Sequence, residues 1–219
     1  MRQSILNDAF FAGLDSSVLS LERAETLPPE CYTDADFYEL EKEALFNHEW
    51  LCLGRESDIP EPGDFFTAHI VDEPIIVVRN KKGEIRAMSA VCQHRAMLLA
   101  EGKGNKRAFR CPYHHWTYSL DGNLLKGPAM EETCDFIKED FNLPTFLVET
   151  WLGFIFINFD ESAEPLAPRL EAVKETIAGY DLASADGIEP ETVVFPWNWS
   201  LDHLSSKWMG CCCLPWFET

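Results

Sequence analysis

The chain has 219 residues, of which 46% are hydrophobic and 12% aromatic, so it can bury a core and extensive disorder is excluded. Its net charge of −19 comes without basic stripes, which argues against nucleic acid as a partner. The acidic residues are spread thinly, and a solvated surface fits them better than acidic patches that dock a basic electron donor. No apolar run is long enough for a membrane helix, and Asn7 and Asp8 interrupt the apolar N-terminus. We therefore expect a cytoplasmic protein.

The N-terminal part of the chain is expected to be a helical arm. Residues 1–30 show weak patterning and end at a double proline. Thr33 or Asp34 then caps an expected helix that runs to about His48, because apolar residues recur at helical spacing. A turn rich in proline and glycine follows at residues 60–63.

The middle of the chain is expected to be a small antiparallel β domain. Short β-branched and aromatic runs alternate there with turn residues such as Asp121-Gly122. The expected strands are residues 75–78, 85–91, 108–110, 116–118 and 151–159. Beyond them, the pattern predicts a helix over 166–177 and a further strand over 192–195. The predicted fold class is therefore mainly β, with domain boundaries near residues 45 and 165.

Two short motifs carry the chemistry that we expect. Cys92 and His94 form the first motif, and Cys111 and His114 form the second, sixteen residues further along. Each motif pairs one thiolate with one imidazole on a tight loop, and two such loops that face each other bind two irons. In a Rieske-type [2Fe–2S] centre, one iron takes both cysteines and the other takes both histidines. We therefore predict these four residues as ligands of a cluster.

A structural zinc site with the same four ligands is the main alternative. Zinc sites usually pair cysteine with cysteine and histidine with histidine along the chain, whereas here the order is interleaved. Cys31, Cys52 and Cys134 are interpreted as ordinary thiols, and core packing is the default role for Trp50, Trp116 and Trp151. The eight cysteines do not resemble a secreted disulfide framework.

Around these motifs the chain resembles the large (alpha) subunit of the Rieske non-haem iron ring-hydroxylating oxygenases. The likeness covers about residues 30–199, and its clearest segments are residues 32–50, 59–66, 111–122 and 149–158. It implies a Rieske domain at 46–165, after an arm at 1–45 and before the truncated start of a catalytic α+β domain at 166–219. Tyr113 stands where respiratory Rieske proteins carry an extra cysteine, which favours the oxygenase type.

Two positions beside the motifs depart from the family pattern. Ala96 and His115 stand where the family often has glycine. His115 is expected to be a neighbour that points away from the cluster, because His114 already fits the ligand spacing. Arg95 is expected either to form a hydrogen bond near the cluster or to pair with an acidic residue.

The resemblance ends in the region where the family holds a mononuclear Fe(II). Asn198-Trp199 matches the opening of the helix that carries two iron-binding histidines in relatives, but the expected histidines are missing. Asp202 and His203 are adjacent in sequence and do not converge on one ion from a helix. The run of cysteines at 211–213 is interpreted as incidental. Our hypothesis is that the sequence after Trp199 results from a frameshift or a truncated gene, and the catalytic residues are therefore unknown.

The resemblance implies the following function. A reductase or ferredoxin reduces the cluster, which passes electrons to a mononuclear iron that hydroxylates an organic, aromatic substrate with O2. Such relatives are homo-oligomers, commonly trimers, or hetero-oligomers. This chain alone should carry the cluster but not complete the oxygenation. The alternatives are a stand-alone Rieske electron-transfer protein and a zinc-stabilised module without redox chemistry.

Overall fold

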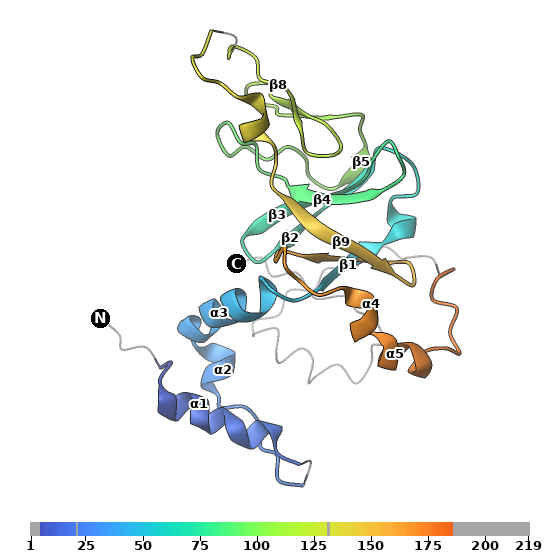
Figure 1. Ribbon diagram of the computed structural model, residues 1–219. Coiled ribbons are helices and arrows are strands. Elements are labelled where there is room, and N and C mark those ends of the chain that lie inside the picture. The colour runs from blue at the N-terminus through green and yellow to red at the C-terminus, as the bar shows by residue number, and fades with distance from the viewer. Residues whose placement is uncertain (1–4, 21, 131, 186–219) are drawn as a thin grey trace. The chain divides into compact units, whose positions relative to one another are not determined.

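The computed structural model describes residues 5–20, 22–130 and 132–185 (Figure 1). The chain divides into two compact units, one with the N-terminal residues up to Asn47 and the other His48–Glu191. The domain boundaries expected near residues 45 and 165 remain predictions, and the calls on residues 192–219 lie outside the described residues. No helix among the described residues is long and apolar enough to cross a membrane.

The first unit consists of short helices. Its elements are α1 (Asp8–Leu14), η1 (Asp15–Val18), α2 (Glu30–Thr33), α3 (Ala35–Glu41) and η2 (Lys42–Phe46), of which η2 is a π turn. The predicted cap is confirmed at the start of α3, where a side-chain oxygen of Asp34 accepts a hydrogen bond from the backbone N–H of Asp36 at 2.9 Å. The helix expected from this cap is therefore present, with a π turn in its last part.

The second unit is built on an antiparallel sheet of seven strands with a smaller three-stranded sheet beside it, which confirms the mainly β fold class. The large sheet has the order β1-β10-β9-β4-β3-β2-β5, and the small sheet has the order β6-β7-β8. The strands of the large sheet are β1 (Leu51–Arg55), β2 (Asp64–Ile70), β3 (Glu73–Arg79), β4 (Ile85–Ser89), β5 (Lys103–Asn105), β9 (Thr145–Trp151) and β10 (Phe154–Asn158). Those of the small sheet are β6 (Phe109–Arg110), β7 (Thr117–Tyr118) and β8 (Leu124–Lys126).

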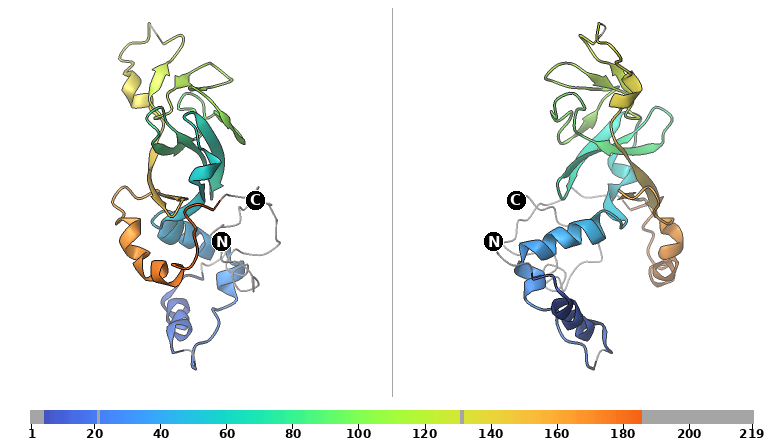
Figure 2. Two further views of the ribbon diagram at one scale, coloured as in Figure 1. Left: turned by 90° about the vertical axis from the view of Figure 1, so that its right-hand side faces the viewer. Right: turned by 60° about the vertical axis from the view of Figure 1, so that its left-hand side comes forward.

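The core of this unit runs without interruption from the large sheet into the small one. Four consecutive residues of β3, from Ile75 to Val78, are fully buried, as a β-branched run without alternation predicts. Two of them, Ile76 and Val78, belong to one buried cluster with Phe65 of β2, Phe109 of β6 and Tyr118 of β7. The small sheet lies at the end of the unit away from helices α4 (Leu166–Arg169) and α5 (Glu171–Thr176) (Figures 1 and 2).

Two expected elements differ in the structure. The run 151–159 is not one strand, because Trp151 ends β9 and a two-residue turn precedes β10. Leu152 and Gly153 form this turn with φ angles of 49° and 81°, which reverses the chain inside an otherwise apolar run. The single helix expected over 166–177 is divided into α4 and α5 at Leu170, whose φ of −98° and ψ of 2° interrupt the helix.

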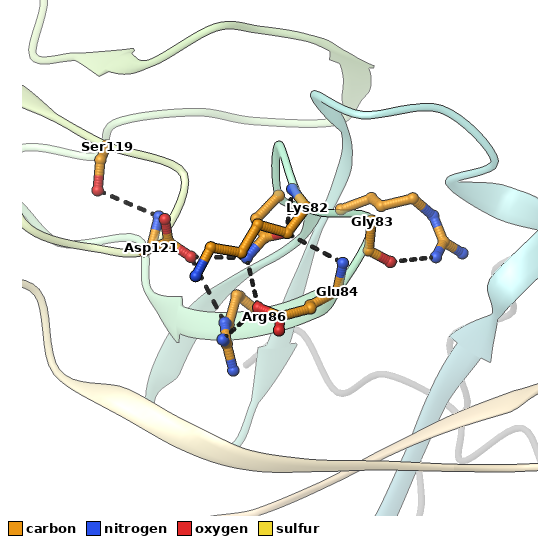
Figure 3. Close-up of polar contacts among 8 residues, drawn as sticks. Lys82, Gly83, Glu84, Arg86, Ser119 and Asp121 are labelled. Carbon is orange, nitrogen blue, oxygen red and sulfur yellow. Dashed lines mark hydrogen bonds and ion pairs between the residues drawn. The ribbon is translucent and has the colours of Figure 1, made fainter.

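A polar network around the buried Asn80 joins the two sheets (Figure 3). Asn80, in the turn after β3, is 1% exposed, and its amide nitrogen donates hydrogen bonds to Glu84 at 2.9 Å and to Asp121 at 2.8 Å. Its side-chain oxygen accepts from the backbone N–H groups of Lys82 and Glu84. Arg86 pairs with both carboxylates, at 2.6 and 3.5 Å. Because Asp121 lies in the turn between β7 and β8, this network fixes the small sheet to the β3–β4 turn.

Replacing the amide at the centre of this network should destabilise the fold. Asn80→Ala leaves the backbone N–H groups of Lys82 and Glu84 without their acceptor, and we expect the free energy of unfolding to fall by about 2 kcal/mol. Urea titration followed by circular dichroism measures this loss. Lys81→Ala, an exposed change in the same turn, is the control and should alter the free energy by less than about 0.5 kcal/mol. Equal effects of the two substitutions would contradict the prediction.

The ends of β1 and β10 meet at an acidic residue whose ionisation should set the stability at low pH. Asp160 accepts hydrogen bonds from the Ser162 hydroxyl at 2.6 Å and from His48 Nδ1 at 3.0 Å. These contacts, with that of Ser162 first, lower the pKa of Asp160 from 3.8 to about 2. A lowered pKa in the folded state gives stability that is present above pH 4. The thermal midpoint of unfolding should therefore decrease as the pH is lowered from about 4 to about 2, and this decrease should be smaller in Asp160→Asn. If the variant shows the same pH profile as the original chain, Asp160 does not have this role.

Candidate metal centre

The two motifs form loops of the same construction. In the first loop, the backbone N–H of Cys92 donates to the carbonyl of Met97 at 2.9 Å. In the second loop, the N–H of Cys111 donates to the carbonyl of Trp116 at 2.8 Å. Each loop thus comprises six residues and presents a cysteine at its base.

A residue with positive φ ends the inner turn of each loop. Ala96 has a φ of 52° and donates to the carbonyl of Cys92, and His115 has a φ of 63° and donates to the carbonyl of Cys111. Such a backbone conformation favours glycine. The two departures from the family pattern therefore fall at left-handed positions of the backbone.

The structure brings the four predicted ligands together in two pairs. Cys92 and Cys111 are each 1% exposed, and their thiols lie close enough to interact. The rings of His94 and His114 are 4.6 Å apart between centroids and meet edge to face. The thiols thus form one pair, and the imidazoles form another.

The imidazole nitrogens that face inward have no partner within the protein. Among the described side chains, Nδ1 of His94 and Nδ1 of His114 are buried polar atoms without a hydrogen bond. A polar atom that is buried without a partner gives up its hydrogen bonds to water and gains none in return, which destabilises the fold. Native proteins therefore rarely contain two such atoms side by side. Each can serve as an electron-pair donor to a metal when the ring is neutral and its proton is on the other nitrogen.

Aromatic residues support the imidazole of His94. The indole of Trp116 stacks on this ring, with centroids 4.8 Å apart and planes 7° from parallel. Phe136 and Phe141 in turn pack their edges against the indole, at 5.8 and 5.4 Å. The stack fixes the plane of the imidazole, because the ring cannot rotate without displacing a buried indole.

Tyr118 is a residue of the site that the sequence analysis did not single out. Its hydroxyl lies 3.5 Å from the sulfur of Cys92 and accepts a hydrogen bond from the backbone N–H of Gln93 at 3.1 Å. Burial, followed by the contact with Cys92, raises the pKa of the Tyr118 hydroxyl, so it stays protonated as a donor. The sequence does contain a signal for it: in a strand, Trp116 and Tyr118 lie on the same face and Thr117 on the opposite one.

The pKa shifts of the site are those of groups kept neutral by burial. Burial is the main cause that raises the pKa of the Cys92 thiol, and the neighbouring Cys111 adds to it. Burial also lowers the pKa of the His94 imidazole, with further contributions from His114 and Arg95. Bringing a cation to the thiols would offset this penalty and release their protons.

The other residues considered from the sequence lie outside this arrangement. His115 is exposed, and its carbonyl accepts from the Thr117 hydroxyl. Arg95 is exposed, and among the described residues it forms neither of the two expected contacts. Trp50 donates to the carbonyl of Glu164 at 2.9 Å, on another part of the unit. Asp202, His203 and the cysteines at 211–213 lie outside the described residues.

The curled sheet and its two cysteine–histidine loops define a Rieske domain. Residues 49–147 match the family described as Rieske [2Fe-2S] domain and belong to it. In a wider comparison, the chain is homologous to the alpha subunits of Rieske oxygenases, of which it represents an N-terminal portion. This homology confirms the resemblance identified from the sequence.

The relatives include enzymes with different substrates in their names. The chain is 35% identical over 206 residues to the alpha subunit of biphenyl 2,3-dioxygenase from Rhodococcus jostii, which covers 90% of this chain and 44% of that protein. It is 35% identical over 194 residues to the oxygenase subunit of carnitine monooxygenase from Acinetobacter baumannii, covering 86% and 51%. The chain thus spans about half the length of these relatives.

Solved structures give the same result. Naphthalene 1,2-dioxygenase from Rhodococcus sp. bound to indole is 33% identical with a TM-score of 0.71, covering 79% of this chain and 40% of that one. A quaternary ammonium Rieske monooxygenase in complex with gamma-butyrobetaine is 34% identical with a TM-score of 0.69, covering 81% and 49%.

Proposed function

We propose that Cys92 and Cys111 hold one iron of a [2Fe–2S] cluster and that His94 and His114 hold the other through Nδ1. The observation that carries this assignment is the pair of buried Nδ1 atoms without a partner, which lie between loops that also present two buried thiols. Membership of residues 49–147 in the Rieske [2Fe-2S] family supports it. A cluster with two thiolate and two imidazole ligands takes up and gives back one electron at a higher potential than an all-cysteine cluster.

The chain's own residues prepare the site for this group. Tyr118 supplies a hydrogen bond to the sulfur of Cys92, which stabilises negative charge there. Trp116 holds the plane of the His94 imidazole. The two loops hold the cysteines in the buried core, which excludes water from the sulfur side.

A single zinc ion fits this arrangement less well. Tetrahedral zinc needs its four donors around one point. In the described part of the chain, no three His, Cys, Asp or Glu side chains are grouped so that they could hold one metal ion. Two separate pairs of donors, one of sulfur and one of nitrogen, suit a group with two metal ions.

The complete protein that corresponds to this chain would be an oxygenase alpha subunit. In that protein, electrons pass from a reductase or ferredoxin through the cluster to a mononuclear iron, which hydroxylates an organic substrate with O2. The names of the relatives given above refer to biphenyl and to carnitine, so aromatic compounds and quaternary amines are both candidate classes, with an aromatic substrate as the original expectation. The same proposal includes a cytoplasmic location and assembly into trimers or hetero-oligomers.

A stand-alone electron-transfer protein is the second candidate. It would need only the Rieske domain, whereas the similarity to the biphenyl dioxygenase alpha subunit covers 90% of this chain. Residues on both sides of 49–147 are therefore shared with oxygenases, which favours the first candidate.

Spectroscopy and metal analysis test the cluster directly. The chain should be purified anaerobically after growth with ample iron, and then assayed for iron, acid-labile sulfide and an electron paramagnetic resonance signal after reduction. We expect two irons and two sulfides per chain, a brown colour and a paramagnetic reduced state. A colourless protein with one zinc per chain and no labile sulfide would refute the proposal.

A further inference from the structure

Positive charge is concentrated in the part of the chain that carries the two loops. Residues 92–126 contain six of the 18 lysines and arginines but only two of the 37 acidic residues. The six are Arg95, Lys103, Lys106, Arg107, Arg110 and Lys126, and the two are Glu101 and Asp121. This segment is therefore net positive in a chain whose net charge is −19.

The register of the small sheet places two of these cations on one face. Arg110 of β6 lies opposite Thr117 of β7, which in turn lies opposite Lys126 of β8. Paired residues of neighbouring strands share a face of the sheet, so Arg110 and Lys126 project from the same side. Both side chains are exposed. The other face is buried and carries Phe109, Tyr118 and Leu124.

Arg110 and Lys126 are not neutralised by the described part of the chain. Among the described residues, Arg107, Arg110 and Lys126 form no ion pair, whereas Asp121 is engaged by Arg86 at 3.5 Å. The acidic segment 132–140 packs on the buried side, because its Phe136 and the following Phe141 contact Trp116, and Trp116 alternates with Thr117 along the chain. The exposed face of the small sheet is therefore a basic surface, which we call the β6–β8 face.

We propose that the β6–β8 face is the docking surface for an acidic electron-donor protein. This inference rests on the proposed function and names the charge of its partner. Arg110 immediately precedes Cys111 in the chain, so a donor bound to this face would lie beside the loop that carries two of the four proposed ligands. One electron would pass from the reduced donor to the oxidised cluster, so that the donor loses one electron and the cluster gains one.

The charge of the rest of the chain should direct an acidic donor to the β6–β8 face. A protein with a net charge of −19 repels an acidic partner at long range, and a local basic face then gives the attractive approach. The sequence analysis considered the opposite arrangement, in which acidic patches dock a basic donor. The strand register favours the acidic donor, because it places Arg110 and Lys126 on one face of the small sheet, beside the loop that begins at Cys111.

Stopped-flow reduction of the cluster-loaded chain tests this surface. The probe is an acidic plant-type [2Fe–2S] ferredoxin, reduced beforehand, and the signal is the bleaching of the oxidised cluster. In Arg110→Glu/Lys126→Glu, we expect the second-order rate constant at low salt to fall by about tenfold or more. In the unsubstituted chain, the rate constant should fall steeply between about 0.01 M and 0.5 M salt, because screening removes the attraction.

A double variant with the same change in net charge is the control. Lys81→Glu/Lys174→Glu reverses two exposed lysines that are not on the β6–β8 face, and its rate constant should stay within about twofold of the original. Equal losses in both double variants would overturn the proposal. Analytical ultracentrifugation gives a second test: if Arg110→Glu/Lys126→Glu changes the oligomeric state, the face is an interface between copies of the chain, and the proposal is overturned. Reduction by methyl viologen and the labile sulfide content show separately whether the cluster is present. A chain without a cluster would overturn the proposed function as well as this one.

Discussion

Cys111→Ser is expected to abolish cluster binding, with less than about a tenth of the original iron and labile sulfide retained. A serine hydroxyl is not deprotonated at neutral pH as a coordinated thiol is, and three remaining ligands leave one iron with a single protein donor. The sulfur of Cys111 is also buried beside that of Cys92, so no other described side chain can replace it there. Iron, sulfide and paramagnetic resonance measurements on the purified variant check this result.

A neighbouring substitution separates ligand loss from damage to the loop. His115→Asn changes an exposed side chain next to His114 and keeps a residue type that tolerates the φ of 63° found there. This control should retain two irons and the original spectrum. Far-ultraviolet circular dichroism of both variants shows whether the sheet forms. A full complement of iron and sulfide in Cys111→Ser would exclude Cys111 as a ligand.

Trp116→Ala is expected to lower the free energy of unfolding by about 3–5 kcal/mol, because it opens a large cavity under the second loop. The indole is 1% exposed, stacks on the His94 ring and is contacted by Phe136 and Phe141. Removing it takes away the support of one imidazole as well as the core contacts. Urea unfolding of the variant, with the slope compared with that of the original chain, measures the loss.

Two other aromatic substitutions sharpen this test. Trp116→Phe keeps a ring against His94 and should lose clearly less stability than the alanine variant. Trp50→Ala removes a half-buried indole that is bonded to Glu164, away from the site, and should leave the resonance spectrum of the reduced cluster unchanged. If Trp116→Ala costs less than about 1 kcal/mol and leaves that spectrum unchanged, Trp116 does not support the site.

Elements with a strong local pattern could be predicted from the sequence. The run 75–78 is buried on both sides and consists of β-branched residues, so its pattern alone indicates a strand. Asp34 can cap a helix through its own side chain, which is a local interaction. The cysteine and histidine motifs were likewise visible, because each lies within four residues of chain.

Features that depend on distant contacts could not be predicted. The break at Leu152 and Gly153 falls in a continuous apolar run, where hydrophobicity does not distinguish one strand from the ends of two. Strand β2 lies against β3 and β5, and its mixed sequence becomes a strand only through these partners. Tyr118 becomes part of the site because β7 carries it to Cys92, which lies 26 residues earlier.

The difference in burial between the sulfur and nitrogen donors bears on how long such a centre survives in air. Peroxides attack thiolates, and the damage beyond sulfenic acid is irreversible. Here both thiols are sealed within the hydrophobic core, whereas the imidazoles, which these oxidants attack far less readily, are half-buried. The chain therefore leaves the proposed nitrogen ligands nearer to solvent and shields the proposed sulfur ligands, an arrangement that would protect a cluster from oxidants.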